Sequence, residues 1–90
     1  ESQPQQAKVT SNDQASKIAS TVVAKFVNEK QFNRTWLNSS VKDISKKTFG
    51  GKQEWVVSFF NSQIQDQSKS TLYIFLDING KYVGSNYTGN

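Results

Sequence analysis

The sequence predicts an α+β domain in which one N-terminal amphipathic helix packs on a four-stranded antiparallel β-meander. Two observations carry this prediction. Apolar residues recur at helical spacing over residues 15–27, and the rest of the chain holds two pairs of strand-forming runs, each pair joined by a short glycine turn. A chain of 90 residues has room for one domain. We therefore expect a flexible leader over residues 1–12 and a single domain over residues 13–90.

The helix is predicted to begin at a run of three residues that favour the N-cap position, Ser11, Asn12 and Asp13. Behind them the apolar residues follow the i, i+3, i+4, i+7 spacing of one helix face. The stripe consists of Ala15, Ile18, Ala19, Val22, Val23, Phe26 and Val27. The opposite face is polar, so the helix should lie on a core with one side in water.

Residues 31–40 show no clear period. Phe32, Trp36 and Leu37 interrupt an otherwise polar stretch. We expect a loop or a short helical turn here that closes one end of the core, with Trp36 serving packing rather than a ligand.

The first hairpin is predicted from residues 41–49 and 53–61, with Gly50-Gly51 as the turn between them. A two-residue turn fixes the register, because pairs are counted outward from it. One face then carries the pairs Lys46–Trp55, Ile44–Val57 and Lys42–Phe59. The other carries Lys47–Glu54, Ser45–Val56 and Val41–Phe60.

The second hairpin is predicted over residues 71–88, around Asn79-Gly80. Asn-Gly is a strong hairpin signal because both residues tolerate the positive φ of a type I′ turn. Such a turn makes one mostly apolar face from the pairs Ile78–Lys81, Leu76–Val83, Ile74–Ser85 and Leu72–Tyr87. Residues 62–70, which join the hairpins, are polar and are expected to be a structureless, mobile loop.

Composition restricts the chemistry. Cysteine and histidine are both absent, which excludes thiol nucleophiles, imidazole triads and most transition-metal sites. The remaining carboxylate candidates, Asp43, Glu54 and Asp77, form no convincing catalytic pair, and residues 77–80 are better explained as a hairpin turn than as a calcium loop. We expect no catalytic residues, no cofactor and no metal.

Sheet aromatics near lysines are the candidate partner surface. The residues are Trp55, Tyr73, Phe75, Tyr82, Lys46 and Lys47. Aromatic rings beside ammonium groups can bind single-stranded nucleic acid, but the net charge of +4 comes from ten lysines and only one arginine, so nucleic acid is not the expected partner. Phe75 also has a structural explanation, since an aromatic ring placed across from Gly84 shields the glycine backbone.

The helix-plus-meander order resembles that of the PepSY and PepSY-like domains, in a cystatin-like arrangement. The matching stretches are residues 15–24, 54–57, 72–77 and 80–83, and the likeness covers about residues 13–87. The resemblance implies a small secreted or membrane-tethered bacterial module, of a kind in which several members are thought to inhibit peptidases or to bind partners. It transfers no catalytic residue. This chain departs from the pattern in its long connection over residues 26–41.

The resulting functional expectation is a non-enzymatic, periplasmic or secreted module that binds a protein partner or the envelope surface. The absence of methionine suggests that an upstream segment has been removed, and that segment could have carried a signal peptide or a lipid anchor. No apolar run is long enough to cross a membrane, and we expect a monomer or a weak dimer. Two alternatives remain at this stage: a small-molecule carrier with a pocket between helix and sheet, and a weak binder of single-stranded nucleic acid.

Overall fold

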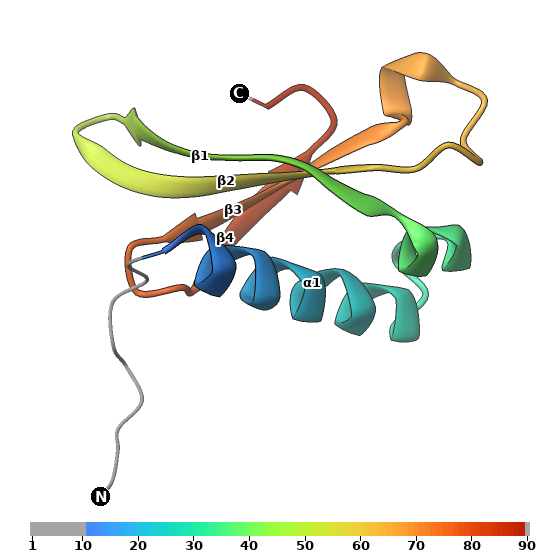
Figure 1. The fold of residues 1–90 in the computed structure, drawn as a ribbon, viewed down its shortest axis with the longest axis horizontal. Helices are drawn as coiled ribbons and strands as arrows, with labels where there is room; N and C mark the ends of the chain where they lie inside the picture. Colours follow the sequence, from blue (N-terminus) through green and yellow to red (C-terminus); the bar gives the residue numbers. More distant parts are fainter. Residues whose placement is uncertain (1–10, 90) are drawn as a thin grey trace, which may run out of the picture.

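A computed structural model describes residues 11–89 of the chain. The element order is α1 (Asn12–Asn28), η1 (Arg34–Asn38), β1 (Ser40–Phe49), β2 (Lys52–Phe60), η2 (Gln67–Lys69), β3 (Thr71–Asp77) and β4 (Tyr82–Asn86). The strands form one antiparallel sheet in the order β1-β2-β3-β4, and α1 lies across one of its faces (Figure 1). The predicted fold class, one N-terminal helix on a four-stranded meander, is confirmed. Residues 1–10 of the predicted leader lie outside the described residues.

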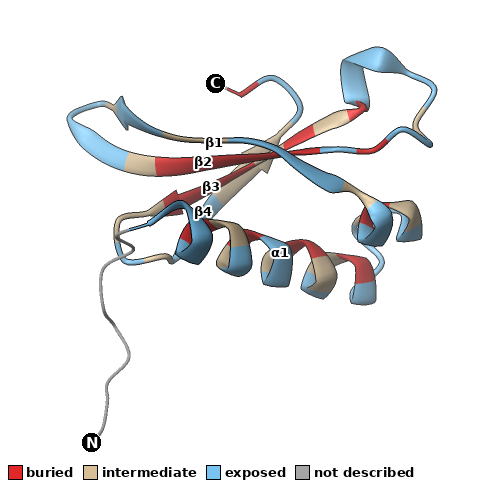
Figure 2. Cartoon of the chain, in the orientation of Figure 1, coloured by how far each residue is buried: buried red, intermediate tan, exposed pale blue. Residues whose placement is uncertain are grey.

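Helix α1 begins where its capping residues predict. The side chain of Ser11 accepts a hydrogen bond from the Gln14 N–H at 3.2 Å, which satisfies one of the free amide groups of the first turn. The buried residues of the helix, Ala15, Ala19, Val23 and Val27, recur every fourth position. The predicted stripe is therefore the face that packs on the sheet (Figure 2).

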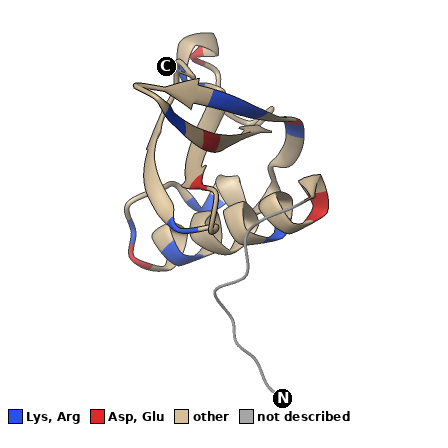
Figure 3. Ribbon diagram, turned by 90° about the vertical axis from the view of Figure 1, so that its left-hand side faces the viewer, with Lys and Arg blue, Asp and Glu red and all other residues tan. Residues whose placement is uncertain are grey.

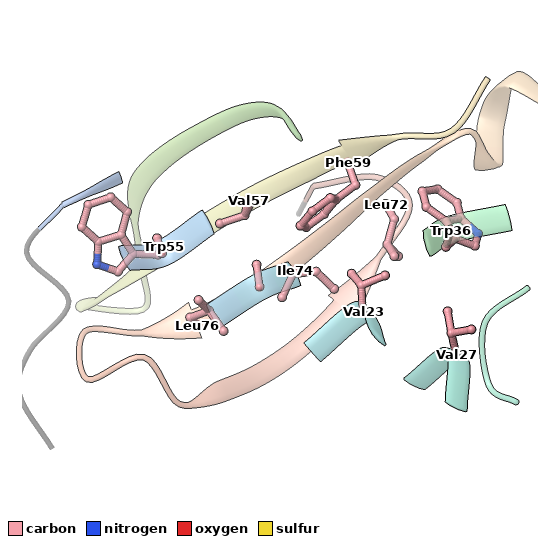
Figure 4. Close-up of a cluster of buried hydrophobic side chains, with 11 residues drawn as sticks. Val23, Val27, Trp36, Trp55, Val57, Phe59, Leu72, Ile74 and Leu76 are labelled. Carbon is pink, nitrogen blue, oxygen red and sulfur yellow. The ribbon is translucent and has the colours of Figure 1, made fainter. Parts of the chain in front are cut away.

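The core fills the space between α1 and the sheet. Val57, Ile74 and Leu76 are fully buried beneath the helix, and their strands contribute further large side chains on the same face. Trp36 closes one end of this core from η1 and is 3% exposed, as the sequence predicted for a plug. Trp55 lies at the opposite end (Figure 4).

The first hairpin has the predicted turn. Gly50 and Gly51 both have positive φ, at 57° and 83°, which is the type I′ conformation that needs glycine-like residues. The pairs Lys46–Trp55, Ile44–Val57, Lys47–Glu54 and Ser45–Val56 are confirmed.

The predicted pairs Lys42–Phe59 and Val41–Phe60 are wrong. A β-bulge at Lys42 leaves that residue without a direct partner, so Val41 pairs with Phe59 and Ser40 with Phe60. A bulge adds a residue to one strand and bends it. Here the bend occurs where β1 arrives from η1.

The second hairpin differs from its prediction at the turn. The Gly80 N–H donates to the carbonyl of Asp77 and the Asp77 N–H donates to the carbonyl of Lys81, so the loop has three residues instead of two. Gly80 has φ of 83°, whereas Asn79 has no positive φ. This is the type I turn with a glycine bulge that three-residue hairpin loops adopt. Ile78 therefore lies in the loop and does not pair with Lys81.

A β-bulge at Val83 then restores the predicted register. Leu76 pairs with Tyr82 instead of Val83, but Phe75 pairs with Gly84 and Ile74 with Ser85 as predicted. The extra loop residue, Ile78, shifts the pairing of β3 with β4 by one residue. The unpaired Val83 shifts it back by one, so the pairs beyond Val83 are the predicted ones.

The connection over residues 62–70 is not structureless. It contains η2, which is capped by Asp66. The Asp66 side chain accepts hydrogen bonds from the Ser68 N–H and hydroxyl. Ser70 is buried, and Ile64 packs against the core. The polar composition of this segment hid these local hydrogen bonds, which hold it in a defined shape.

Candidate functional site

The predicted partner surface is divided between the two faces of the sheet. Trp55, Lys46 and Tyr82 lie on the face that carries α1. Tyr73, Phe75 and Lys47 alternate with core residues and lie on the outer face. The expectation that the six residues share one surface is therefore wrong.

Trp55 is a core residue. Its side chain is 5% exposed, and the ammonium nitrogen of Lys46 lies 5.1 Å from its ring centroid. That distance suits a cation–π contact. The Lys46 side chain thus covers Trp55 at the edge of the core, where β1 pairs with β2. The indole Nε1 is buried without a hydrogen-bond partner.

Tyr82 also faces α1, as a result of the three-residue turn. Pairing with Leu76 turns its ring toward the helix, where the centroid lies 5.1 Å from that of Phe26 in an edge-on arrangement. Its hydroxyl shares a hydrogen bond of 3.0 Å with the hydroxyl of Ser85. Tyr82 thus stabilises the helix-facing layer and is not part of an outer aromatic surface.

The outer face holds a small apolar layer of its own. Val56 is 3% exposed and Phe75 is 6% exposed, although neither faces α1. The ring of Phe49 lies edge-on to that of Phe75 at 5.7 Å, and Gly89 lies so close to the ring of Tyr73 that a Cβ there would be 3.0 Å from it. Most of the aromatic surface predicted to be free is therefore covered by residues of the same chain.

The open part of the outer face is a cleft near the two hairpin ends. It consists of two adjoining hollows of about 560 Å³ and 330 Å³, which share Glu54 and Val83. We call this region the outer cleft and define it by six of its lining residues: Phe49, Glu54, Phe75, Asp77, Val83 and Gly84.

Gly84 helps to create the outer cleft. It pairs with Phe75, and no atom lies within 4 Å of the position that a Cβ would occupy. The missing side chain leaves a gap with Phe75 and Phe49 beside it. The Phe75 ring does not shield the Gly84 backbone as expected from the sequence, because the space above Gly84 is open.

Val83 marks the outer cleft more clearly than any other residue. As the bulged residue of β4 it is extra to the pairing with β3, its side chain is 51% exposed, and it lines both hollows. Bulges are frequent beside functional sites because they redirect a side chain. The predicted pairing of Val83 with Leu76 puts Val83 on the core face, and the bulge in β4 is the reason that it lies in the outer cleft instead.

The rim of the outer cleft carries two acidic residues. Glu54 and Asp77 are direct neighbours across β2 and β3. One oxygen of the Asp77 carboxylate accepts the N–H groups of Asn79 and Lys81 at 2.8 and 2.9 Å, so this oxygen serves the turn. Glu54 and Asp77 are close because of the register between β2 and β3. The loop that connects these strands contains no sequence signal from which that register could be predicted.

Other candidate chemistry is limited in the part of the chain that the structure describes. Among residues 11–89 no three acidic side chains are grouped closely enough to hold a metal ion. A hollow of about 170 Å³ lies between α1 and η1, lined by Val23, Ala24, Trp36, Leu37 and Phe59 among others. No helix of this same stretch has the length and apolar character needed to cross a membrane.

The family DUF6488, described as a family of unknown function, matches residues 1–90. The chain belongs to this family. No curated protein and no solved structure gives a significant match. Membership in DUF6488 therefore assigns no activity, and the outer cleft is the feature on which a functional proposal for this DUF6488 chain can be built.

Proposed function

We propose that the chain is a non-enzymatic binding module that acts in the periplasm or outside the cell and holds a segment of another protein in the outer cleft. The observation that carries this proposal is the position of Val83. This apolar residue is the bulged residue of β4, its side chain is half exposed, and it lies where the two hollows meet. Apolar side chains that line a concave surface are a common setting for ligand recognition.

The outer cleft combines the features that a peptide or a loop requires. Phe49, Phe75 and Val83 supply an apolar floor, and Gly84 leaves room for a side chain of the partner. Charges of both signs lie at the rim, Glu54 and Asp77 together with Lys52, so the apolar floor and not the net charge defines the partner. The compartment rests on the resemblance of residues 13–87 to PepSY domains, which are typically secreted or membrane-tethered.

The binding proposal is tested with three variants of the full chain, tagged and produced in the source cell. Val83→Asp places a charge in the outer cleft, and Gly84→Val adds bulk to its gap at a position where a Cβ would meet nothing within 4 Å and where φ is not positive. Leu37→Asp is the matched control, because Leu37 is 53% exposed and lies on η1, away from the outer cleft.

We expect a protein that is retained by the unaltered chain and by Leu37→Asp to be lost from both cleft variants. Far-ultraviolet circular dichroism should show that all three variants keep their fold. Retention of the same protein by Val83→Asp and Gly84→Val would show that the outer cleft does not bind it.

The compartment is tested separately, by fractionating cells that produce the protein from its own gene. We expect the protein in the periplasmic, membrane or medium fraction. Recovery in the cytosolic fraction alone would contradict the compartment without affecting the cleft.

A further inference from the structure

Strand β1 is the longer of the two sheet edges. It runs for 10 residues, Ser40–Phe49, and β2 is its only strand neighbour in the described sheet. Most of its side chains are exposed, and none is fully buried (Figure 2). An edge of this kind presents unpaired N–H and C=O groups to any extended chain of suitable length.

The register of the first hairpin identifies the free backbone groups. Phe49 and Lys52 flank a two-residue turn and so form a hydrogen-bonded pair, and the pattern alternates from there along the antiparallel strands. Consequently the amide groups of Ile44, Lys46 and Thr48 point away from β2.

The charge of this edge is mostly positive. Lys42, Lys46 and Lys47 lie on β1 together with one carboxylate, Asp43, and Glu54 of β2 lies opposite Lys47. Basic segments are visible on the upper strands in Figure 3, where the hairpin ends face the viewer. Lysines on an edge strand disfavour pairing with a second copy of the same edge, because positive charges would be brought together. The same lysines would attract a strand that carries carboxylates.

The other edge lacks these properties. Strand β4 has five residues and contains both the bulge at Val83 and the strand glycine Gly84. Short length and a bulge are common ways of protecting an edge from pairing. The bulge of β1, at Lys42, lies outside the regular run 43–49 that carries the free amides. An incoming strand therefore has one suitable edge, and its charge selects the partner.

We propose that β1 accepts an extended acidic segment of another protein as an additional strand of the sheet. Main-chain hydrogen bonds from the free amides would provide affinity, and Lys42 and Lys47 would select carboxylate side chains, whereas Lys46 lies over Trp55 on the helix face. This inference goes beyond the outer cleft, because it concerns the edge of the sheet and a different type of ligand.

The probe is a synthetic peptide of about nine residues in which glutamate and valine alternate, with both ends blocked, a length that can pair along most of β1. It is titrated into the ¹⁵N-labelled full chain and followed by NMR. We expect the largest amide shifts at Ile44, Lys46 and Thr48. Two matched peptides serve as controls: one with lysine in place of glutamate, and one with alternate amides methylated so that it cannot pair as a strand. Neither control should bind.

Charge variants of the protein separate local attraction from general attraction. Lys42→Glu combined with Lys47→Glu should weaken binding of the acidic peptide by about tenfold, a loss consistent with several weak surface charge contacts. Lys17→Glu combined with Lys25→Glu makes the same change in net charge on the exposed side of α1 and should alter the affinity by less than about twofold. Lys46 is left unchanged because it covers Trp55.

The proposal is overturned by any of three results: shifts confined to β4 or to the outer cleft, equal loss of binding in the two double variants, or equal binding of the methylated peptide. Shifts on β1 that depend on protein concentration without peptide would assign the edge to a second copy and would also overturn it. Val83→Asp should leave peptide binding unchanged, so failure of the outer cleft and failure of the β1 edge give different results.

Discussion

Asp77 determines the shape of the second hairpin. One oxygen of its carboxylate accepts two backbone N–H groups of the loop, and this local network favours a type I turn over the two-residue turn that Asn79-Gly80 alone would predict. The choice of turn in turn decides which face Tyr82 occupies and leaves Val83 as the bulged residue. One side chain thus has consequences for both faces of the sheet.

Removing this acceptor tests the role of Asp77. We expect Asp77→Ala to lower the free energy of unfolding by about 1 kcal/mol, because two exposed hydrogen bonds are lost. Asp77→Asn, which keeps the side-chain oxygen, should cost less than half as much in urea denaturation. Equal losses for the two variants would mean that the charge matters and the acceptor geometry does not.

Asp66 gives the connecting loop a dependence on pH. Hydrogen bonds from the Ser68 hydroxyl and N–H lower the pKa of the Asp66 carboxyl below its usual 3.8. Because the folded-state pKa is the lower one, the stabilisation is complete above 3.8 and is lost as the pH falls through the folded-state value.

We therefore expect the amide signal of Ser68 to titrate with a midpoint below 3.8 when followed by NMR. In Asp66→Asn the titration of this signal should disappear. A midpoint at or above 3.8 in the unaltered chain would show that the hydrogen bonds to Asp66 do not favour the charged form.

At the scale of elements, Asn61 joins two segments that the sequence analysis treated separately. Its side chain donates to the hydroxyl of Thr35 in η1 at 2.8 Å and accepts from the Gln63 N–H at 3.0 Å, and the residue is 2% exposed. Its backbone N–H also donates to the carbonyl of Ser70. The turn η1 and the connecting loop are therefore tied together at one buried amide.

We expect Asn61→Ala to lower the free energy of unfolding by about 2 kcal/mol, since it leaves partners of a buried polar group unsatisfied. A double-mutant cycle with Thr35→Ala should give a coupling energy of about 1 kcal/mol. Additive losses in chemical denaturation would contradict a direct link between η1 and the loop.

The elements themselves could be predicted from the sequence, but the details that form the outer cleft could not. Helical periodicity and two glycine turns were enough for α1 and for all four strands, because these signals are local. The bulges at Lys42 and Val83 have no local signature. The proximity of Glu54 and Asp77 depends on how β2 pairs with β3. The burial of Trp55 depends on which face of the first hairpin α1 covers, and both faces of that hairpin carry apolar residues in the sequence.

At the scale of the whole molecule, one core spans the length of the domain. Trp36 and Trp55 are buried at its two ends, and α1, β2 and β3 contribute the buried residues between them (Figure 4). A core that is continuous between its ends should be lost as one unit, as in most small domains.

This continuity can be tested with one tryptophan at a time. In Trp36→Phe and in Trp55→Phe, the remaining indole reports on one end of the core. We expect the urea midpoint measured by fluorescence to coincide with the midpoint measured by circular dichroism in each variant. Separate midpoints in either variant would divide the domain into independently unfolding parts.

The two sides of the sheet differ in what covers them in the described chain. Helix α1 begins in the layer on one side of the sheet, while Gly89 rests on Tyr73 on the other side (Figure 1). A molecule bound in the outer cleft would therefore approach the sheet from the side opposite to the helix and would leave the exposed side of α1 uncovered.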